Sequence, residues 1–186
     1  MRRIIGSLGI VSLAALLGAC AAGSGGSMQA KAFDQAALPA AVQVPAGHMV
    51  AMETVGTGLI TYECRAKVSA ADQYEWAFVG PDAKLLDRSG KEVGKYFGPP
   101  ATWQSNDGSK ITATQLAVAP AQPGAIPLQL VKANAAMGAG TMQGVAYIQR
   151  VATQGGVAPA RVCDAAALRS KETVKYQADY IFWRAV

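Results

Sequence analysis

The sequence predicts an all-β fold, namely a single antiparallel β-sandwich or barrel-like domain of roughly eight to ten short strands with one disulfide and little helix. Residues 59–68 alternate apolar and polar side chains, and this period of two is typical of a half-buried strand. The alternation directs Ile60, Tyr62 and Cys64 toward the core. Residues 173–183 alternate in the same way.

The second alternating segment is expected to bury one face completely and part of the other. The residues predicted to point inward are Val174, Tyr176, Ala178, Tyr180 and Phe182. The opposite face is polar at first but ends in Ile181 and Trp183. We therefore expect a neighbouring segment to cover that apolar end.

Shorter strands and turns are predicted between these two segments. Further strands are expected at 48–55, 74–79, 93–97, 110–118, 126–133 and 141–151. Turn-forming residues that separate the strands occur at 56–58, 87–90, 106–108 and 155–156. Helix is expected only as short pieces at 33–37 and 165–170.

The first residues have the layout of a secretory signal. Arg2 and Arg3 precede an apolar run over 4–17 that is too short to span a bilayer permanently. Leu17 to Cys20 resembles the bacterial lipobox, in which the cysteine thiol receives a diacylglycerol; an ordinary secretory signal that happens to carry a cysteine is the alternative. Because Ala21 follows instead of an aspartate, resemblance to Gram-negative sorting rules favours the outer membrane, facing the periplasm.

This layout divides the chain into three parts. Residues 1–19 are expected to be the lipoprotein signal peptide, 20–36 a lipid-anchored flexible tether containing a glycine-serine stretch, and 37–186 one β-rich domain. The membrane, reached through the lipid on Cys20, is the one partner this pattern predicts.

Cys64 and Cys163 remain once Cys20 is assigned to the lipid. An even pair in a secreted chain is typical of a disulfide, although two buried free thiols are the alternative. Such a bridge would join the beginning of the domain to its end.

The charge of the mature chain is modest. Of 17 basic residues, Arg2 and Arg3 leave with the signal, so 15 basic against 12 acidic residues give a surplus of three. These charges form no run of one sign, and nucleic acid is therefore not an expected partner.

Few residues suggest metal, cofactor or nucleophilic chemistry. His48 is the only histidine, whereas zinc and copper sites draw on several His or Cys ligands. No nucleophile elbow accompanies a serine, and Gly138 and Gly140 lack the third glycine of a dinucleotide loop. We expect no metal and no cofactor.

The candidate catalytic residues are carboxylates, each with a structural alternative. Asp107 lies in an Asn-Asp-Gly segment that is also typical of a tight turn. Glu63, Glu75 and Asp179 are predicted on outward strand faces, where solvated charges are common. We therefore assign no catalytic residue.

A binding surface is predicted from aromatic and basic residues. Arg150 stands at a strand end beside a glycine-containing loop and is a candidate for holding an anionic ligand; pairing with Asp164 or Asp179 is the structural alternative. A pocket for a carbohydrate or an apolar ligand is a second candidate, unless the aromatic residues concerned are core; these are Trp76, Trp103 and Trp183 with Tyr96 and Phe97. The complete set of ligand-binding candidates is Lys95, Tyr96, Phe97, Trp103 and Arg150.

Short motifs in one fixed order give the chain a resemblance to a known family. The motifs are YEC at 62–64, WAF at 76–78, PDA at 81–83, GP at 98–99 leading to Trp103, DGS at 107–109, IP at 126–127, IQR at 148–150, TQGG at 153–156, AP at 158–159, CD at 163–164 and YQADY at 176–180. From about Leu38 to Phe182 the chain resembles the domain of unknown function 3455 family of bacterial and fungal secreted proteins. The resemblance implies no activity.

The chain departs from that family's pattern at one place. The family usually shows a histidine before an aromatic residue and then Gly-Pro-Thr-Trp, whereas residues 95–103 contain no histidine and are two residues longer. A site built around that imidazole is not expected here.

Together these features predict a lipid-anchored cell-envelope protein that acts as a ligand-binding or structural module. The ligand class, whether small molecule, glycan or protein, stays open. The alternative is a hydrolase that acts on envelope carbohydrates or esters through carboxylates such as Asp107 or Asp179.

Overall fold

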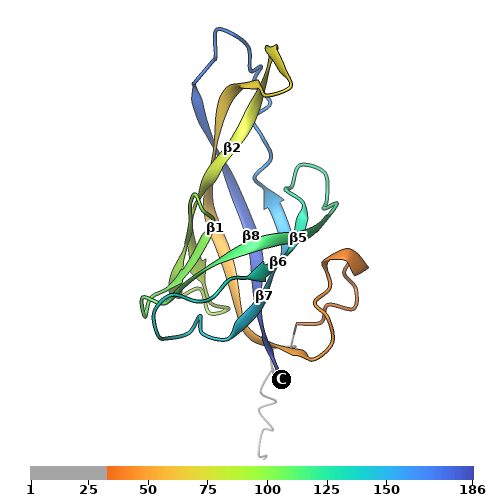
Figure 1. The fold of residues 1–186 in the computed structure, drawn as a ribbon, viewed down its shortest axis with the longest axis vertical. Coiled ribbons are helices and arrows are strands. Elements are labelled where there is room, and N and C mark those ends of the chain that lie inside the picture. The colour runs from red at the N-terminus through yellow and green to blue at the C-terminus, as the bar shows by residue number, and fades with distance from the viewer. Residues whose placement is uncertain (1–32) are drawn as a thin grey trace, which may run out of the picture. The chain divides into compact units, whose positions relative to one another are not determined.

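The computed structural model describes residues 33–186, which form eight antiparallel strands in a single closed sheet (Figure 1). The strands are β1 (His48–Lys67), β2 (Ala70–Leu86), β3 (Glu92–Phe97), β4 (Thr102–Ser105), β5 (Lys110–Ala119), β6 (Leu128–Ala133), β7 (Val145–Gly155) and β8 (Lys171–Ala185). Each strand pairs with the next, and β8 pairs with β1 to close a barrel. The predicted all-β fold is therefore confirmed.

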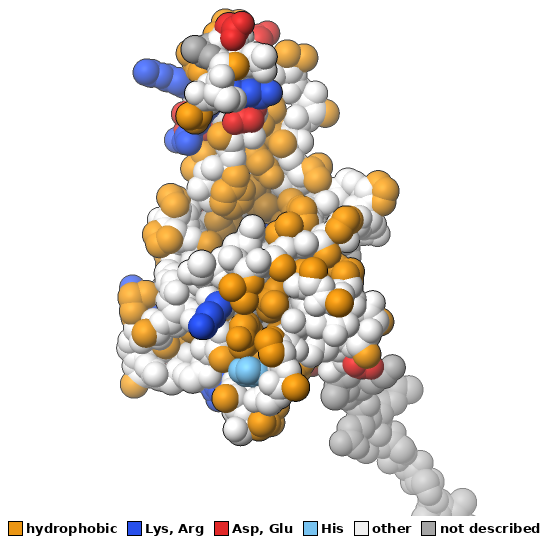
Figure 2. Space-filling view, turned by 45° about the vertical axis from the view of Figure 1, so that its right-hand side comes forward, with side chains coloured by type: hydrophobic (Ala, Val, Ile, Leu, Met, Phe, Trp, Pro, Cys, Tyr) orange, Lys and Arg blue, Asp and Glu red, His pale blue; other side chains and the backbone are white. Residues whose placement is uncertain are grey.

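Three long strands extend beyond the barrel as an arm. β1, β2 and β8 run to the upper end of the molecule, whereas the other strands stop lower down (Figure 1). The pairing of β3 with β2 covers only Asp82 to Leu86, so the part of β2 before Asp82 pairs with β1 alone. Figure 2 shows charged side chains of both signs at the tip of this arm and hydrophobic side chains in the recess below it.

The turn expected at 56–58 is wrong, because β1 continues through these residues without interruption. The glycines are needed for close packing instead. A Cβ on Gly56 would lie 2.5 Å from Cε2 of Tyr180, and a Cβ on Gly58 would lie 2.2 Å from the carbonyl oxygen of Asp82. Glycine within a strand is typical of such close approaches.

The inner faces of the strands pack a core rich in aromatic side chains. Tyr96 stacks on Trp103 with ring centroids 4.6 Å apart, and both rings contact Tyr180. The inward face predicted for β8 is confirmed, because Tyr176, Ala178, Tyr180 and Phe182 belong to this core.

A second apolar cluster lies on the outer face, where the segment 33–44 packs against the barrel. Val42 and Val44 of this segment pack with Ile181 and Trp183, and Phe33 meets Trp183 edge to face at 6.3 Å between ring centroids. The cover expected over the apolar end of β8 is thereby found. It comes from the residues just before β1.

The two expected helices are wrong. The residues from 33 to 186 contain no α-helix, only the short 3₁₀ turn η1 (Ala40–Val42). Residues 165–169 form turns, because Asp164 caps the backbone N–H of Ala167 and the N–H of Arg169 donates to the carbonyl oxygen of Cys64. Strand β4 was not predicted. No helix among the described residues is long and apolar enough to cross a membrane.

The predicted disulfide between Cys64 and Cys163 is present, with their Cα atoms 5.5 Å apart. It joins β1 to the loop that connects β7 to β8. Backbone hydrogen bonds between Cys64 and the residues Arg169 and Ser170, and a bond of 2.8 Å from Nε1 of Trp76 to the carbonyl oxygen of Arg161, fix the same loop. The free-thiol alternative is excluded.

Candidate functional site

The five predicted ligand-binding residues lie on two different sides of the barrel wall. Tyr96 and Trp103 point inward and are only 5% and 3% exposed. Arg150 lies opposite Tyr180 in the β7–β8 register, and residues directly opposite each other share a face. Lys95 and Phe97 alternate with Tyr96 and therefore point outward, where both are exposed. One surface does not contain all five.

Arg150 forms hydrogen bonds with a backbone carbonyl group and not with Asp164 or Asp179, the two acids considered from the sequence. Its Nε and one terminal nitrogen donate to the carbonyl oxygen of Pro127 at 3.2 and 3.0 Å. Asp179 instead pairs with Arg88, at 2.7 Å, and the Asp164 carboxylate accepts from the N–H of Ala167. The predicted pairing of Arg150 with either acid is therefore wrong, and within residues 33–186 no carboxylate forms a salt bridge with it.

The environment of Arg150 is a group of tyrosines from the inner wall, namely Tyr62, Tyr96, Tyr176 and Tyr180. Burial raises the pKa of each phenol, and the positive charge of Arg150 offsets part of that rise. These hydroxyls consequently stay protonated. The hydroxyls of Tyr176 and Tyr180 lie 3.4 Å apart, and that of Tyr62 donates to the carbonyl oxygen of Gly156 at 2.7 Å.

The barrel interior is filled by these rings themselves. Tyr180 is 1% exposed and lies 5.0 Å from Tyr96 and 5.7 Å from Trp103, measured between ring centroids. Nε1 of Trp103 finds no acceptor among the described residues. Tyr96 and Trp103 therefore act as core, which was the structural alternative for the aromatic residues.

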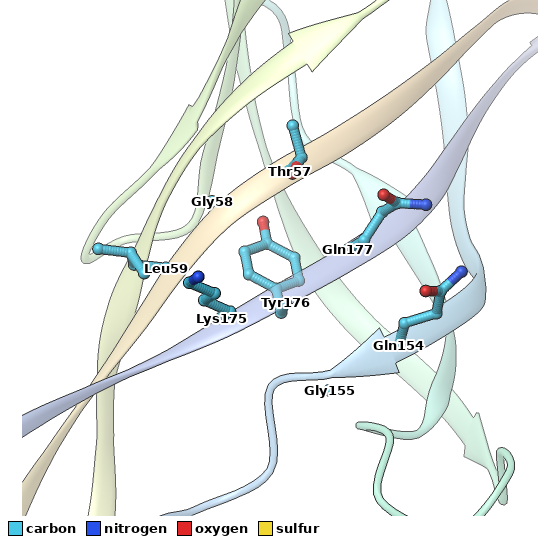
Figure 3. A pocket seen from close by; sticks show the side chains of 8 residues that line it. All are labelled: Thr57, Gly58, Leu59, Gln154, Gly155, Lys175, Tyr176 and Gln177. Atoms are coloured by element: carbon cyan, nitrogen blue, oxygen red, sulfur yellow. The ribbon is translucent and has the colours of Figure 1, made fainter.

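A groove with polar walls lies across the outer side of β7, β8 and β1 (Figure 3). Its volume is about 560 Å³. The residues that line it are Thr57, Gly58, Leu59, Gln154, Gly155, Lys175, Tyr176 and Gln177. Gln154, Gln177 and Thr57 lie directly opposite one another on the three strands, and their side chains therefore share one face.

A bulge in β7 sets this alignment. The register passes from Val151 opposite Asp179 to Gln154 opposite Gln177, so β7 holds one more residue than β8 over this stretch. The extra residue coincides with a positive φ of 48° at Ala152. Without the bulge, Gln154 would point to the other face, because a shift of one residue inverts a strand.

Apart from Tyr176, whose hydroxyl lies 3.4 Å from that of Tyr180, the polar side chains of the groove make no hydrogen bonds with the described part of the chain. This holds for Thr57, Gln154, Lys175 and Gln177, which all line the same hollow. Glutamines elsewhere behave differently: Gln149 donates to the carbonyl oxygen of Val42 at 2.6 Å. The donors and acceptors of the groove are thus free to meet a ligand.

A second hollow of about 440 Å³ adjoins the groove on its β2 side. The two share Thr57 and Gly58. Lys84, Lys95, Asp82 and Glu92 also line the second hollow, and Lys84 pairs with Glu92 at 2.9 Å. Sequence reasoning found Lys95 but missed the groove residues, which are scattered over three strands.

A comparison with known protein families decides where this chain belongs. A family model described as "Protein of unknown function (DUF3455)" matches residues 45–184, which is most of the chain. The chain belongs to the DUF3455 family. No curated protein and no solved structure matches it.

The match includes seven DUF3455 strands in full and β8 up to its next-to-last residue. It therefore includes the groove residues and the disulfide. The segment 33–44 that covers the outer apolar cluster precedes the matched range.

Two of the carboxylates considered for catalysis in this DUF3455 domain, those of Asp107 and Asp179, are held by other residues. Asp107 accepts the backbone N–H and hydroxyl of both Ser109 and Thr141 at 2.6–2.9 Å, and these bonds hold its pKa far below the ordinary range. Asp179 shares Arg88 with Glu53. The turn interpretation of Asp107 is supported, since its carboxylate joins two loops.

His48 of the DUF3455 domain lies against an aromatic ring. Its imidazole meets Tyr147 edge to face at 4.9 Å between centroids, and its Nδ1 lies 3.0 Å from the carbonyl oxygen of Pro45. Within residues 33–186, no three His, Cys, Asp or Glu side chains gather in a way that would hold a metal ion.

Proposed function

We propose that this DUF3455 protein is a lipid-anchored cell-envelope protein whose β-barrel binds a polar ligand in the groove shown in Figure 3. One observation carries the binding proposal: four of the polar side chains that line the groove, those of Thr57, Gln154, Lys175 and Gln177, have no hydrogen-bond partners among the described residues. Ligand sites are typically concave and contain a few convergent polar groups.

The chemistry of the groove favours a ligand that carries many hydroxyl groups. Gln154 and Gln177 each supply an amide that both donates and accepts, Thr57 supplies a hydroxyl, and Lys175 supplies a cation. A hydroxyl of a sugar both donates and accepts and therefore matches such side chains. Each hydrogen bond contributes about 0.5 to 1.5 kcal/mol net, so several are needed for measurable affinity.

The proposed location rests on the N-terminal sequence and on the disulfide. Cys20 and the signal peptide lie outside the described residues, and the Leu17 to Cys20 segment is the evidence for the lipid. Disulfides persist in oxidising compartments such as the periplasm, which supports an extracytoplasmic domain. The resulting placement is the outer membrane, with the barrel facing the periplasm.

The anchor is tested by Cys20→Ser. Loss of the lipid removes the hydrophobic attachment, so the variant should move from the membrane fraction to the soluble fraction on centrifugation. A variant that stays with the membranes to the same extent as the unaltered protein would rule the anchor out.

The binding site is tested with glycan and small-molecule arrays and the detergent-solubilised full chain. The double variant Gln154→Ala/Gln177→Ala should lose at least about tenfold in affinity for the best array ligand, because it removes two bonding amides. The matched control is Gln115→Ala/Gln129→Ala, which removes two glutamines that bond each other away from the groove. Equal affinity of the two double variants would contradict the proposal.

A further inference from the structure

We infer that the groove is one part of a longer polar belt that binds an extended acidic polysaccharide across five strands. The inference rests on the proposed binding function and adds the ligand class and the binding mode. It uses the registers of four strand pairs, two adjoining hollows and the placement of the lysines.

The belt is a single row of side chains at right angles to the strands. Thr57 on β1 lies opposite Gln177 on β8 and Lys84 on β2. Gln177 lies opposite Gln154 on β7, and Lys84 lies opposite Lys95 on β3. Directly opposite residues share a face, so all five point outward. Four strand spacings of about 4.8 Å make the row roughly 19 Å long.

The surface along this row is hollowed. The groove of about 560 Å³ and the second hollow of about 440 Å³ meet at Thr57 and Gly58. Gly58 is a fixed part of the floor, because a Cβ there would lie 2.2 Å from the carbonyl oxygen of Asp82. Thr57 and the backbone of Gly58 therefore line both hollows.

Two lysines without salt bridges in the described part of the chain lie along the belt: Lys95 is its last member on β3, and Lys175 lies beside it on β8, two residues before Gln177. Lys175 lines the groove, Lys95 lines the second hollow, and neither forms a salt bridge within residues 33–186. Lys84 between them is neutralised by Glu92, at 2.9 Å. Asp82 also lines the second hollow and forms no salt bridge within residues 33–186, so the two hollows together hold three lysines against two carboxylates.

This arrangement fits a linear polymer that carries both carboxylates and hydroxyls. Lys95 and Lys175 lie three strands apart, a separation of about 14 Å that one sugar ring does not bridge. The polymer places carboxylates on the lysines and hydroxyls on the glutamines and the threonine. Single-stranded nucleic acid fits less well, because the belt side chains include no aromatic ring on which bases stack.

The test uses alginate, a linear polyuronate, and dextran, a neutral polymer of similar length, with the detergent-solubilised full chain in calorimetric titrations. We expect alginate to bind at least about tenfold more tightly than dextran, to gain affinity with chain length until the belt is covered, and to lose affinity as salt rises. Lys95→Ala and Lys175→Ala should each weaken alginate binding about two- to fivefold and should act independently.

Lys132→Ala is the matched control, since it removes an exposed lysine from β6, outside the belt. It should leave alginate binding unchanged. Equal affinity for alginate and dextran, no effect of Lys95→Ala or of Lys175→Ala, or equal binding of single-stranded DNA would each overturn the acidic-polysaccharide inference. A neutral glycan that depends on Gln154 and Gln177 would overturn it while leaving the proposed binding function intact.

Discussion

Asp107 joins two loops of the barrel through the hydrogen bonds of its carboxylate. Its two carboxylate oxygens accept four hydrogen bonds, two from Ser109 in its own turn and two from Thr141 in the loop before β7. The turn itself could be predicted from the Asn-Asp-Gly sequence. The contact with Thr141 could not, because 34 residues separate the two positions.

We predict that Asp107→Asn lowers the stability at neutral pH and flattens its pH dependence. The folded-state pKa of Asp107 lies below its ordinary value of 3.8, so its stabilisation is fully present above that value and is lost as the pH falls through the folded-state pKa. Thermal melts at about pH 7 and pH 2 should therefore separate the two proteins more at the higher pH than at the lower, where the pH approaches the folded-state pKa.

The matched control for this comparison is Asp34→Asn, which removes a carboxylate that bonds only the nearby N–H of Ala36. It should follow the unaltered protein at both pH values. A constant difference between Asp107→Asn and the unaltered protein would show that the carboxylate charge is not the cause.

At the scale of an element, the segment 33–44 is also held in place by a contact with a residue far away in the sequence. Its role depends on Gln149 of β7, whose buried amide donates to the carbonyl oxygen of Val42 and to Oε1 of Gln35 and accepts from Nε1 of Trp183. The sequence indicated that Trp183 needs cover. It did not indicate the source, because the covering segment contains no strand pattern.

We predict that Gln149→Leu destabilises the domain by about 2 to 4 kcal/mol, because it leaves the N–H of Trp183 and the carbonyl oxygen of Val42 buried without partners. Urea denaturation followed by tryptophan fluorescence measures the change. Gln115→Leu, on an exposed part of β5, should cost far less. Equal losses for the two variants would contradict the role assigned to Gln149.

Strand patterns in the sequence were informative where one face is buried and misleading where glycine occurs. Period-two alternation located the second half of β1 and nearly all of β8, because their inner faces meet the core. The glycines at 56 and 58 favour a turn on composition alone, but in the folded chain they admit Tyr180 and the backbone of β2. Strand β4 has only four residues and shows too little alternation to detect.

At the scale of the whole molecule, the Cys64–Cys163 disulfide links parts of the chain 99 residues apart. We predict that reduction costs about 4 to 5 kcal/mol in the entropic treatment of cross-links, because it releases a long loop in the unfolded chain. Urea unfolding with and without a phosphine reductant measures the loss.

The double variant Cys64→Ser/Cys163→Ser is the control for the reductant. Its unfolding midpoint should be lower than that of the oxidised protein and should not respond to the phosphine. An unchanged midpoint for the reduced protein would show that the cross-link contributes little to stability.

The all-β class and the cross-link could be predicted from the sequence, whereas the binding groove could not. The groove depends on β1 lying beside β8, a pairing between opposite ends of the domain that local patterns do not reveal. It depends as well on the bulge near Ala152, since pattern alone does not fix register. Lys95 was found because it is basic and lies next to aromatic residues, while Gln154 and Gln177 carry no comparable signal.

Barrel closure by β8 also constrains how the molecule is made. β8 supplies Tyr176, Tyr180 and Phe182 to the core and is the hydrogen-bonding neighbour of both β1 and β7. While a ribosome still held that strand, β1 and β7 would each keep an unpaired edge, and the contacts of Tyr180 with Tyr96 and Trp103 would be missing. Such a nascent chain is open to misassociation until β8 is free to pair with both neighbours.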